Sequence, residues 1–176
     1  MKRGVKLWAT LIAFGSLLVI MGTAPASDII VGQSSVIDGD TIEVRGERIR
    51  LFGIDAPESA QMCVTMAGGN WPCGRRASFA LADHIGVRNV TCTKRGTDRW
   101  SRTIATCRVQ NGDIQAWMVA NGWALAFVRY SRTYASSQAQ ARQTKAGMWA
   151  GSFQAPWDWR KDRNSPPFEA VSGPVE

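Results

Sequence analysis

The sequence predicts an α+β domain, a five-stranded OB-fold Greek-key barrel with three helices. Two observations lead to this fold class. Five short segments are apolar or alternate between apolar and polar residues, which is typical of strands in a half-buried sheet. A segment with apolar residues three and four positions apart, typical of a helix, separates the third strand from the fourth. Three consecutive strands, a helix and two further strands match the order of elements in an OB-type barrel.

The first three strands are predicted at residues 29–37, 41–44 and 48–54. Residues 29–37 are mostly apolar or small, and the other two segments alternate between apolar and polar side chains. The loop at 45–47 contains Gly46, and a short glycine-containing loop between two such segments is typical of a hairpin. We therefore expect three consecutive antiparallel strands.

The second half of the chain is predicted to alternate between helices and extended segments. A helix over 74–85 ends at Gly86, and strands follow at 87–94 and 102–109 around a turn at Asp98. Asp113 is a favourable N-cap for a helix over 114–121, which Gly122 would end. Residues 123–128 form an extended apolar segment, and a last helix covers 137–146.

Residues 1–26 are expected to form a signal peptide. Basic residues at positions 2, 3 and 6 precede an apolar run over 7–21, and Ala24, Pro25 and Ala26 offer a small-residue cleavage site. An uncleaved membrane anchor is the alternative, since the run is at the short end of what spans a bilayer. We expect a secreted or periplasmic monomer with no stable membrane partner after signal removal.

The rest of the chain is expected to hold one domain and a tail. The chain of 176 residues is long enough for a single core, which we place at residues 27–159. Residues 160–176 contain little apolar material and several prolines, so we expect this tail to be disordered. The net charge of +7 falls by three to +4 without the basic residues at positions 2, 3 and 6, a modest excess that suits a polyanionic partner.

The even number of cysteines predicts disulfides in an exported chain. Four cysteines allow three pairings. Cys92 and Cys107 lie symmetrically about the turn at Asp98, so they would face one another on two antiparallel strands. Cys63 and Cys73 would then close a second, short loop, and the other pairings stay open. A zinc site is disfavoured because neither close cysteine pairs nor a histidine cluster is present.

Charged residues collect at the ends of the predicted strands. The sequence has Asp38-Gly39-Asp40 before the second strand and Asp55-Ala56-Pro57-Glu58 after the third, with Arg50 within the third. A hard divalent cation prefers carboxylate and carbonyl oxygens, and a phosphoryl group that is being transferred needs cations and planar donors around it. This stretch supplies both kinds of group.

These motifs closely resemble those of the staphylococcal nuclease (thermonuclease) family of calcium-dependent nucleases. The resemblance rests on the segments VIDGDTIEV at 36–44, RLFGIDAPE at 50–58 and DRWSR at 98–102, and it extends over about residues 29–149. The combination is specific because five charged positions share the spacing of the family across roughly sixty residues. The resemblance also implies an OB-type barrel.

The resemblance implies a metal site and a general base. Ca²⁺ would be held by Asp40, Asp55 and the backbone carbonyl of Ala56, where the family usually has threonine. Glu58 matches the acid that orients the attacking water and is assigned as general base. Asp38 either shapes the turn beside Gly39 or contacts metal-bound water.

The resemblance further implies a phosphate clamp and a stacking surface. Arg50 and Arg102 match the two arginines that clamp the scissile phosphate, and Arg99 is the competitor for the second position. Tyr130 and Trp100 match aromatic positions of the nucleotide pocket, and their rings would stack on bases of any identity. Val128 stands where the family has a further tyrosine.

The function expected from these residues is calcium-dependent hydrolysis of phosphodiester bonds in DNA and RNA with little sequence specificity. The family implies loss of the 5′ oxygen and products that end in a 3′-phosphate. The alternative is a non-catalytic OB-fold module that binds nucleic acid. His84 is the only histidine of the chain, so mechanisms centred on histidine are excluded.

Overall fold

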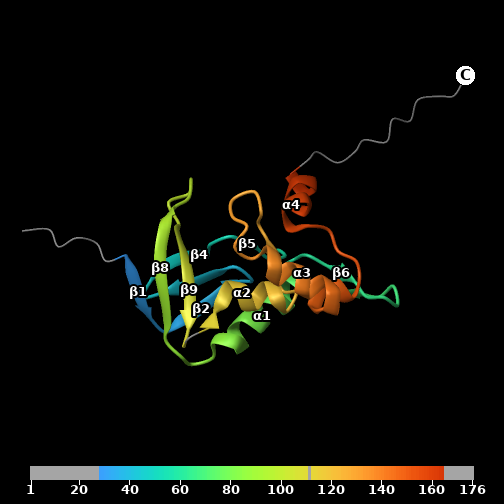
Figure 1. The fold of residues 1–176 in the computed structure, drawn as a ribbon. Coiled ribbons are helices and arrows are strands. Elements are labelled where there is room, and N and C mark those ends of the chain that lie inside the picture. Colours follow the sequence, from blue (N-terminus) through green and yellow to red (C-terminus); the bar gives the residue numbers. More distant parts are fainter. Residues whose placement is uncertain (1–27, 111, 165–176) are drawn as a thin grey trace, which may run out of the picture.

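A mixed β-sheet and the helices beside it form this protein, whose computed structural model describes residues 28–110 and 112–164 (Figure 1). The strand order is β1-β8-β9-β4-β3-β2, and β10 also pairs with β9. Neighbouring strands are antiparallel except for β4 and β9, which run parallel. The strands are β1 (Ile29–Gly32), β2 (Ser34–Asp38), β3 (Thr41–Val44), β4 (Glu47–Leu51), β8 (Val90–Thr97), β9 (Thr103–Val109) and β10 (Gly112–Asp113).

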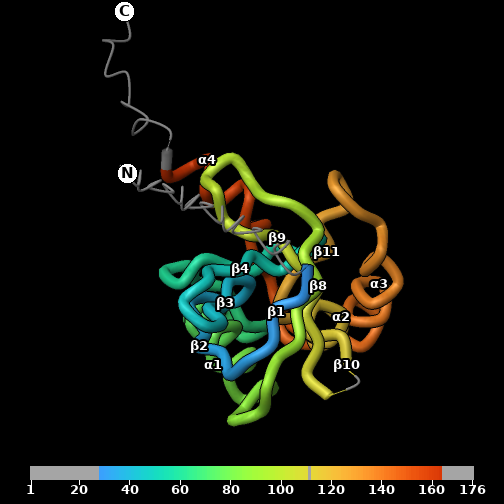
Figure 2. The backbone as a smooth tube through the Cα atoms, turned by 90° about the vertical axis from the view of Figure 1, so that its left-hand side faces the viewer, coloured from blue at the N-terminus to red at the C-terminus, as the bar shows by residue number. Residues whose placement is uncertain are grey.

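The predicted α+β class is confirmed, but the sheet is not closed into a barrel. The predicted first strand is divided at Gln33 into β1, which pairs with β8, and β2, which pairs with β3. The tube in Figure 2 shows this blue segment passing from beside β3 to beside β8. The two edge strands of the sheet are therefore consecutive pieces of one segment.

Two short ladders lie outside the main sheet. The predicted third strand divides at Phe52 and Gly53 into β4 and β5 (Ile54–Asp55), because Gly53 adopts a left-handed backbone conformation with φ 75°. β5 then pairs with β11 (Leu125–Ala126), the central part of the predicted extended segment. β6 (Cys63–Val64) pairs with β7 (Asn70–Trp71). The bend at Gly53 carries Asp55 away from the main sheet toward the site.

The helices confirm the local sequence signals. Helix α1 (Cys73–Ile85) buries Ala77, Leu81 and Ile85, which are four positions apart, and ends at Gly86. Helix α2 (Ile114–Ala120) begins after Asp113, whose side chain accepts a hydrogen bond from the Ala116 N–H. Helix α3 (Ala135–Thr144) is followed by a 3₁₀ helix (Gly147–Ala150) and by α4 (Pro156–Asn164).

Helix α4 corrects the predicted boundary of the ordered domain. Residues 160–164 belong to a helix that begins at Pro156, whereas the sequence predicts a disordered tail from residue 160. Trp157 on this helix packs against a small second core around Cys63, Leu125 and Met148. Packing against these apolar side chains stabilises the helix on the domain. The rest of the predicted tail, 165–176, lies outside the described residues.

Both predicted disulfides are confirmed. Cys92 and Cys107 are paired residues of β8 and β9 and form one bridge, and Cys63 and Cys73 form the other. Disulfides indicate an oxidising compartment outside the cytoplasm. The predicted signal peptide, 1–26, lies outside the described residues. Among residues 28–110 and 112–164, the structure has no helix with the length and apolar character that a membrane span requires.

Candidate functional site

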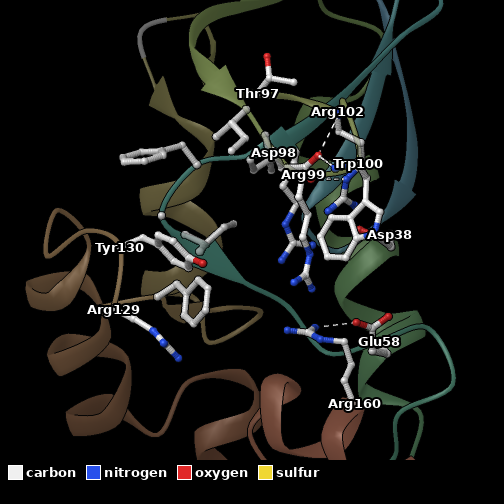
Figure 3. A pocket seen from close by; sticks show the side chains of 17 residues that line it. Asp38, Glu58, Thr97, Asp98, Arg99, Trp100, Arg102, Arg129, Tyr130 and Arg160 are labelled. Atoms are coloured by element: carbon white, nitrogen blue, oxygen red, sulfur yellow. Dashed lines mark hydrogen bonds and ion pairs between the residues drawn. The ribbon is translucent and has the colours of Figure 1, made fainter. Parts of the chain in front are cut away.

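An open cleft of ≈ 980 Å³ lies between the turn at Asp98, the bend at Gly53 and helix α4 (Figure 3). Predicted site residues Glu58, Arg50 and Arg102 line it together, although they come from different elements. Trp100 and Tyr130 also line it, on opposite sides in the view of Figure 3. Further lining residues are Asp38, Leu51, Phe52, Gly53, Ile54, Thr97, Asp98, Arg99, Ile104, Phe127, Arg129 and Arg160.

Asp40 and Asp55 converge on one guanidinium group. The Nη1 atom of Arg50 donates to Asp40 Oδ1, and its Nη2 atom donates to Asp55 Oδ1 at 2.6 Å. The side chains of Asp40 and Asp55 are 2% and 0% exposed, and that of Arg50 is 19% exposed. Two buried carboxylates thus share one partly exposed cation at the wall of the cleft.

The backbone fixes the orientation of Asp40. Its own N–H donates to Asp38 Oδ1 at 3.0 Å, which closes the tight turn predicted for Asp38. Its Oδ2 atom accepts a hydrogen bond from the Ala56 N–H at 2.7 Å. A Cβ atom at Gly39 would lie 2.6 Å from the Cβ of Ala56, so only glycine lets the two segments approach this closely. The turn that carries Asp40 before β3 is therefore held against Ala56, which directly follows β5.

Burial and ion pairing act in opposite directions on the pKa values of Asp40 and Arg50. Burial raises the pKa of Asp40 well above its ordinary value, and the nearby Arg50 guanidinium works against that shift. Burial also disfavours the charged form of Arg50, but Asp40 and Asp55 outweigh it and raise the pKa of Arg50. The Arg50 guanidinium therefore remains charged, and Asp40 and Asp55 together favour a cation between them.

Arg160, on helix α4, is a site residue that the sequence analysis missed. Its Nη2 atom donates to Asp55 Oδ2 at 2.7 Å, and its Nη1 atom donates to Glu58 Oε1 at 2.7 Å. The same Nη1 atom lies 3.2 Å from Asp55 Oδ1. Figure 3 shows Arg160 pointing from α4 toward Glu58. Pro156 at the helix start, Asp158 in the first turn and basic residues in the last turn are signals that could have predicted this helix.

The loop that carries Glu58 is attached to the start of α1. The Gln61 N–H donates to the Glu58 carbonyl at 2.7 Å, and the Gly74 N–H donates to the Gln61 carbonyl at 3.2 Å. The disulfide between Cys63 and Cys73 joins the same two segments. A Cβ atom at Gly74 would lie 1.7 Å from the Glu58 carbonyl oxygen. Glycine at this position therefore allows the helix to support the Glu58 loop.

Replacing Gly74 by alanine is expected to destabilise the protein. Alanine favours helix by about 1 kcal/mol over glycine, but here its Cβ clashes with backbone, and such overpacking costs about 1–3 kcal/mol. We expect a net loss in the free energy of unfolding, measured by urea denaturation. Gly69→Ala is the matched control, because its Cβ would come no closer than 3.4 Å to the Thr65 side chain. Equal stability of the two variants would contradict the prediction.

The turn at Asp98 places Arg102 and Trp100 on the cleft wall. Asp98 Oδ1 accepts from the N–H groups of Trp100 and Arg102 at 2.9 Å each, and Asp98 Oδ2 accepts from Arg102 Nε at 2.7 Å. Burial works against the charged form, but these hydrogen bonds lower the pKa of Asp98. Arg99 and Arg102 place their guanidinium carbons 4.0 Å and 5.2 Å from the centre of the Trp100 ring. This wall therefore combines an aromatic face with two cations.

Exposed aromatic rings lie on both sides of the cleft. Tyr130 is 72% exposed and Trp100 is 62% exposed. Tyr130 contacts Phe127 with ring centroids 4.9 Å apart, which supports its ring from one side. Both rings are therefore accessible from the cleft, although the Arg99 guanidinium already lies over the Trp100 ring.

The acids best placed to hold a metal ion are the buried pair Asp40 and Asp55. Among residues 28–110 and 112–164, no three side chains of His, Cys, Asp or Glu are grouped so that they could hold a metal ion. Asp40 and Asp55 are the buried carboxylates that share Arg50, and the Ala56 backbone is bonded to one of them. A metal here would take a few protein oxygens, with water and a ligand supplying the rest.

Comparisons with known proteins identify the family of this chain. Residues 48–151, more than half of the chain, match the family model described as "Staphylococcal nuclease homologue". The chain is 38% identical to "Succinoglycan biosynthesis protein ExoI" of Rhizobium meliloti over 135 residues, which are 75% of this chain and 71% of the relative.

Two further relatives cover nearly the whole chain. "Micrococcal nuclease" of Shigella flexneri is 31% identical over 172 residues, 87% of this chain and 93% of the relative. "Protein ParB" of Escherichia coli is 32% identical over 184 residues, 94% of this chain and 97% of the relative. The match to the family model and these relatives show that the chain belongs to the staphylococcal nuclease homologue family.

Proposed function

We propose that this protein is an exported, calcium-dependent nuclease that hydrolyses phosphodiester bonds of DNA and RNA with little sequence specificity. One observation carries the proposal: Glu58, Arg50 and Arg102 line a single cleft, and Arg50 bonds to Asp40 and Asp55, two buried aspartates that lie behind the cleft lining. A carboxylate and guanidinium groups that line the same cleft are groups that phosphodiester hydrolysis requires. The two disulfides support export of the protein. We also propose that the protein is a monomer.

The donor set of the buried pair fits calcium. Asp40 and Asp55 already hold a cation between them, and both offer the hard oxygen ligands that Ca²⁺ prefers. The Ala56 backbone lies beside Asp40, so we propose its carbonyl as a third protein oxygen. When bound, calcium would supply positive charge that polarises the phosphate.

The side chains of the cleft would carry the reaction. Glu58 would accept a proton from a water molecule directed at phosphorus. Arg50 and Arg102 would donate paired hydrogen bonds to the phosphate oxygens and stabilise the charge of the transition state. We propose cleavage at the 5′ oxygen with products that end in a 3′-phosphate, as the family resemblance implies.

The aromatic side chains would hold the bases. The rings of Tyr130 and Trp100 are exposed within the cleft, and stacking on an aromatic ring is available to every base. The adjacent guanidinium groups of Arg99 and Arg102 favour a polyanion at the same wall. This combination supports binding of both DNA and RNA without base readout.

Removing calcium is expected to abolish cleavage. The purified chain without residues 1–26 should cut single-stranded DNA and RNA with Ca²⁺, stop when a chelator is added in excess, and recover when Ca²⁺ is restored. Gel electrophoresis measures the products, and phosphatase treatment should remove their terminal 3′-phosphate. Cleavage that persists in chelator contradicts the calcium requirement. Retention of intact DNA without products supports a non-catalytic binding module instead.

A further inference from the structure

Helix α4 brings Arg160 to the site from beyond the matched family segment. The family model matches residues 48–151, and α4 covers Pro156–Asn164. Arg160 nevertheless contacts two residues inside the segment, Asp55 and Glu58, at 2.7 Å each. The site of this protein therefore includes a residue of the helix that follows the matched segment.

Independent contacts hold α4 in place. The ring of Trp157 stacks on Phe127 with centroids 5.5 Å apart and an interplanar angle of 17°. Just before the helix, the Gln154 carbonyl accepts a hydrogen bond from Gln61 Nε2 at 2.7 Å. Gln61 is fully buried, and its Oε1 atom accepts from the Glu58 N–H at 3.3 Å. The segment that carries Arg160 is thus fixed to the loop that carries Glu58.

Arg160 forms ion pairs with both Glu58 and Asp55. One nitrogen, Nη1, lies 2.7 Å from Glu58 Oε1 and 3.2 Å from Asp55 Oδ1, so it bridges the two acids. Asp55 is completely buried, whereas the Glu58 side chain is 34% exposed and has rotamer freedom of its own. Two neighbouring carboxylates repel one another unless a cation lies between them. Burial disfavours the charged form of Arg160, but Asp55 and Glu58 outweigh it and raise its pKa.

We propose that Arg160 is a positioning residue that holds the Glu58 carboxylate beside Asp55 in the orientation required for water activation. This inference rests on the proposed function for its kinetic readout. Arg160 does not need to contact the substrate in this role. Arg160 acts through Glu58. Helix α4 therefore contributes to the function of the site in addition to packing against the second core.

A purely structural role for Arg160 predicts different results. If Arg160 only attached α4, its loss would lower stability and would leave the turnover of the folded protein unchanged. If it positions Glu58, its loss lowers kcat with little change in KM, because the substrate contacts remain. Its loss also removes a positive charge from Asp55, which would strengthen the binding of Ca²⁺.

The test compares Arg160→Gln, Arg160→Lys and the control Arg163→Gln. Arg163 lies on the same helix, with its guanidinium over the Trp159 ring at 4.9 Å. We expect Arg160→Gln to lower kcat by about 10- to 100-fold, Arg160→Lys to recover part of the loss, and Arg163→Gln to match the wild type. Titration calorimetry should show tighter Ca²⁺ binding by Arg160→Gln than by the control.

Two readouts separate failure of this inference from failure of the proposed function. A folded Arg160→Gln variant with a kcat within twofold of the wild type would overturn the inference. If the wild type does not cleave nucleic acid, the proposed function fails, and a crystal structure of Arg160→Gln still decides the inference. Glu58 in its wild-type orientation would overturn it, and a displaced or multiply oriented Glu58 would support it.

Discussion

Glu58→Gln is expected to lower kcat on single-stranded DNA by about 10²–10⁴-fold, the usual contribution of a general base. Glutamine has nearly the same shape as glutamate and can still accept a hydrogen bond from Arg160, so the loop should keep its structure. It cannot accept the proton of the attacking water. KM should change little, because Arg50, Arg102 and the aromatic rings remain.

The effect of Glu58→Gln is measured by steady-state kinetics with Ca²⁺ at saturating concentration. Asp83→Asn is the matched control, since Asp83 is an exposed acid of α1 that does not line the cleft. The control should retain wild-type kcat and KM, which excludes a general effect of net charge. Full activity of Glu58→Gln would remove Glu58 from the mechanism.

Local signals in the sequence were sufficient to predict most elements of the fold. The glycine at 86 and the aspartate at 113 mark helix ends, and both do so in the structure, because capping depends on the residues immediately around the helix end. The disulfide between Cys92 and Cys107 followed from the symmetry of a hairpin. The division of the first predicted strand at Gln33 could not be predicted in this way, because the apolar pattern continues across Gln33. The two halves differ only in the strands with which they pair, β8 for β1 and β3 for β2.

The sequence could locate the acids of the site but not their partners. The sequence positions of Asp40, Asp55 and Glu58 place them at strand ends. In the structure, Arg50 joins Asp40 to Asp55, and Arg160 joins Asp55 to Glu58. Arg160 was assigned to a disordered tail because its position depends on packing between Trp157 and Phe127, which lie far apart in the chain. Such tertiary contacts leave no periodic pattern in the sequence.

The contact of Arg50 with two aspartates also depends on tertiary structure, because it compensates the cost of burying both carboxylates. A buried carboxylate without a partner is costly, and the two nitrogens of one guanidinium fork can satisfy two carboxylates at once. The family resemblance implies that Arg50 binds the scissile phosphate. The structure shows that the same fork is shared by Asp40 and Asp55, so this arginine links the stability of the buried acids to the proposed chemistry of the cleft.

Arg50→Lys is therefore expected to impair both activity and stability. A single ammonium group cannot place one nitrogen on each aspartate, so one buried carboxylate loses a charged hydrogen bond worth about 1.5–3 kcal/mol. The planar paired donors for phosphate are lost as well, and we expect kcat to fall by about 10²–10³-fold. Urea denaturation measures the first effect, and steady-state cleavage of single-stranded DNA measures the second.

Arg48→Lys is the matched control for Arg50→Lys, since Arg48 is exposed on the same strand and does not line the cleft. Arg48→Lys should match the wild type in both measurements, because the interactions of an exposed guanidinium group contribute little to stability. Unchanged turnover in Arg50→Lys would show that positive charge alone suffices at this position. A loss of stability with unchanged turnover would assign Arg50 to the buried acids and leave Arg102 as the phosphate-binding arginine, since the two effects depend on different partners of the same side chain.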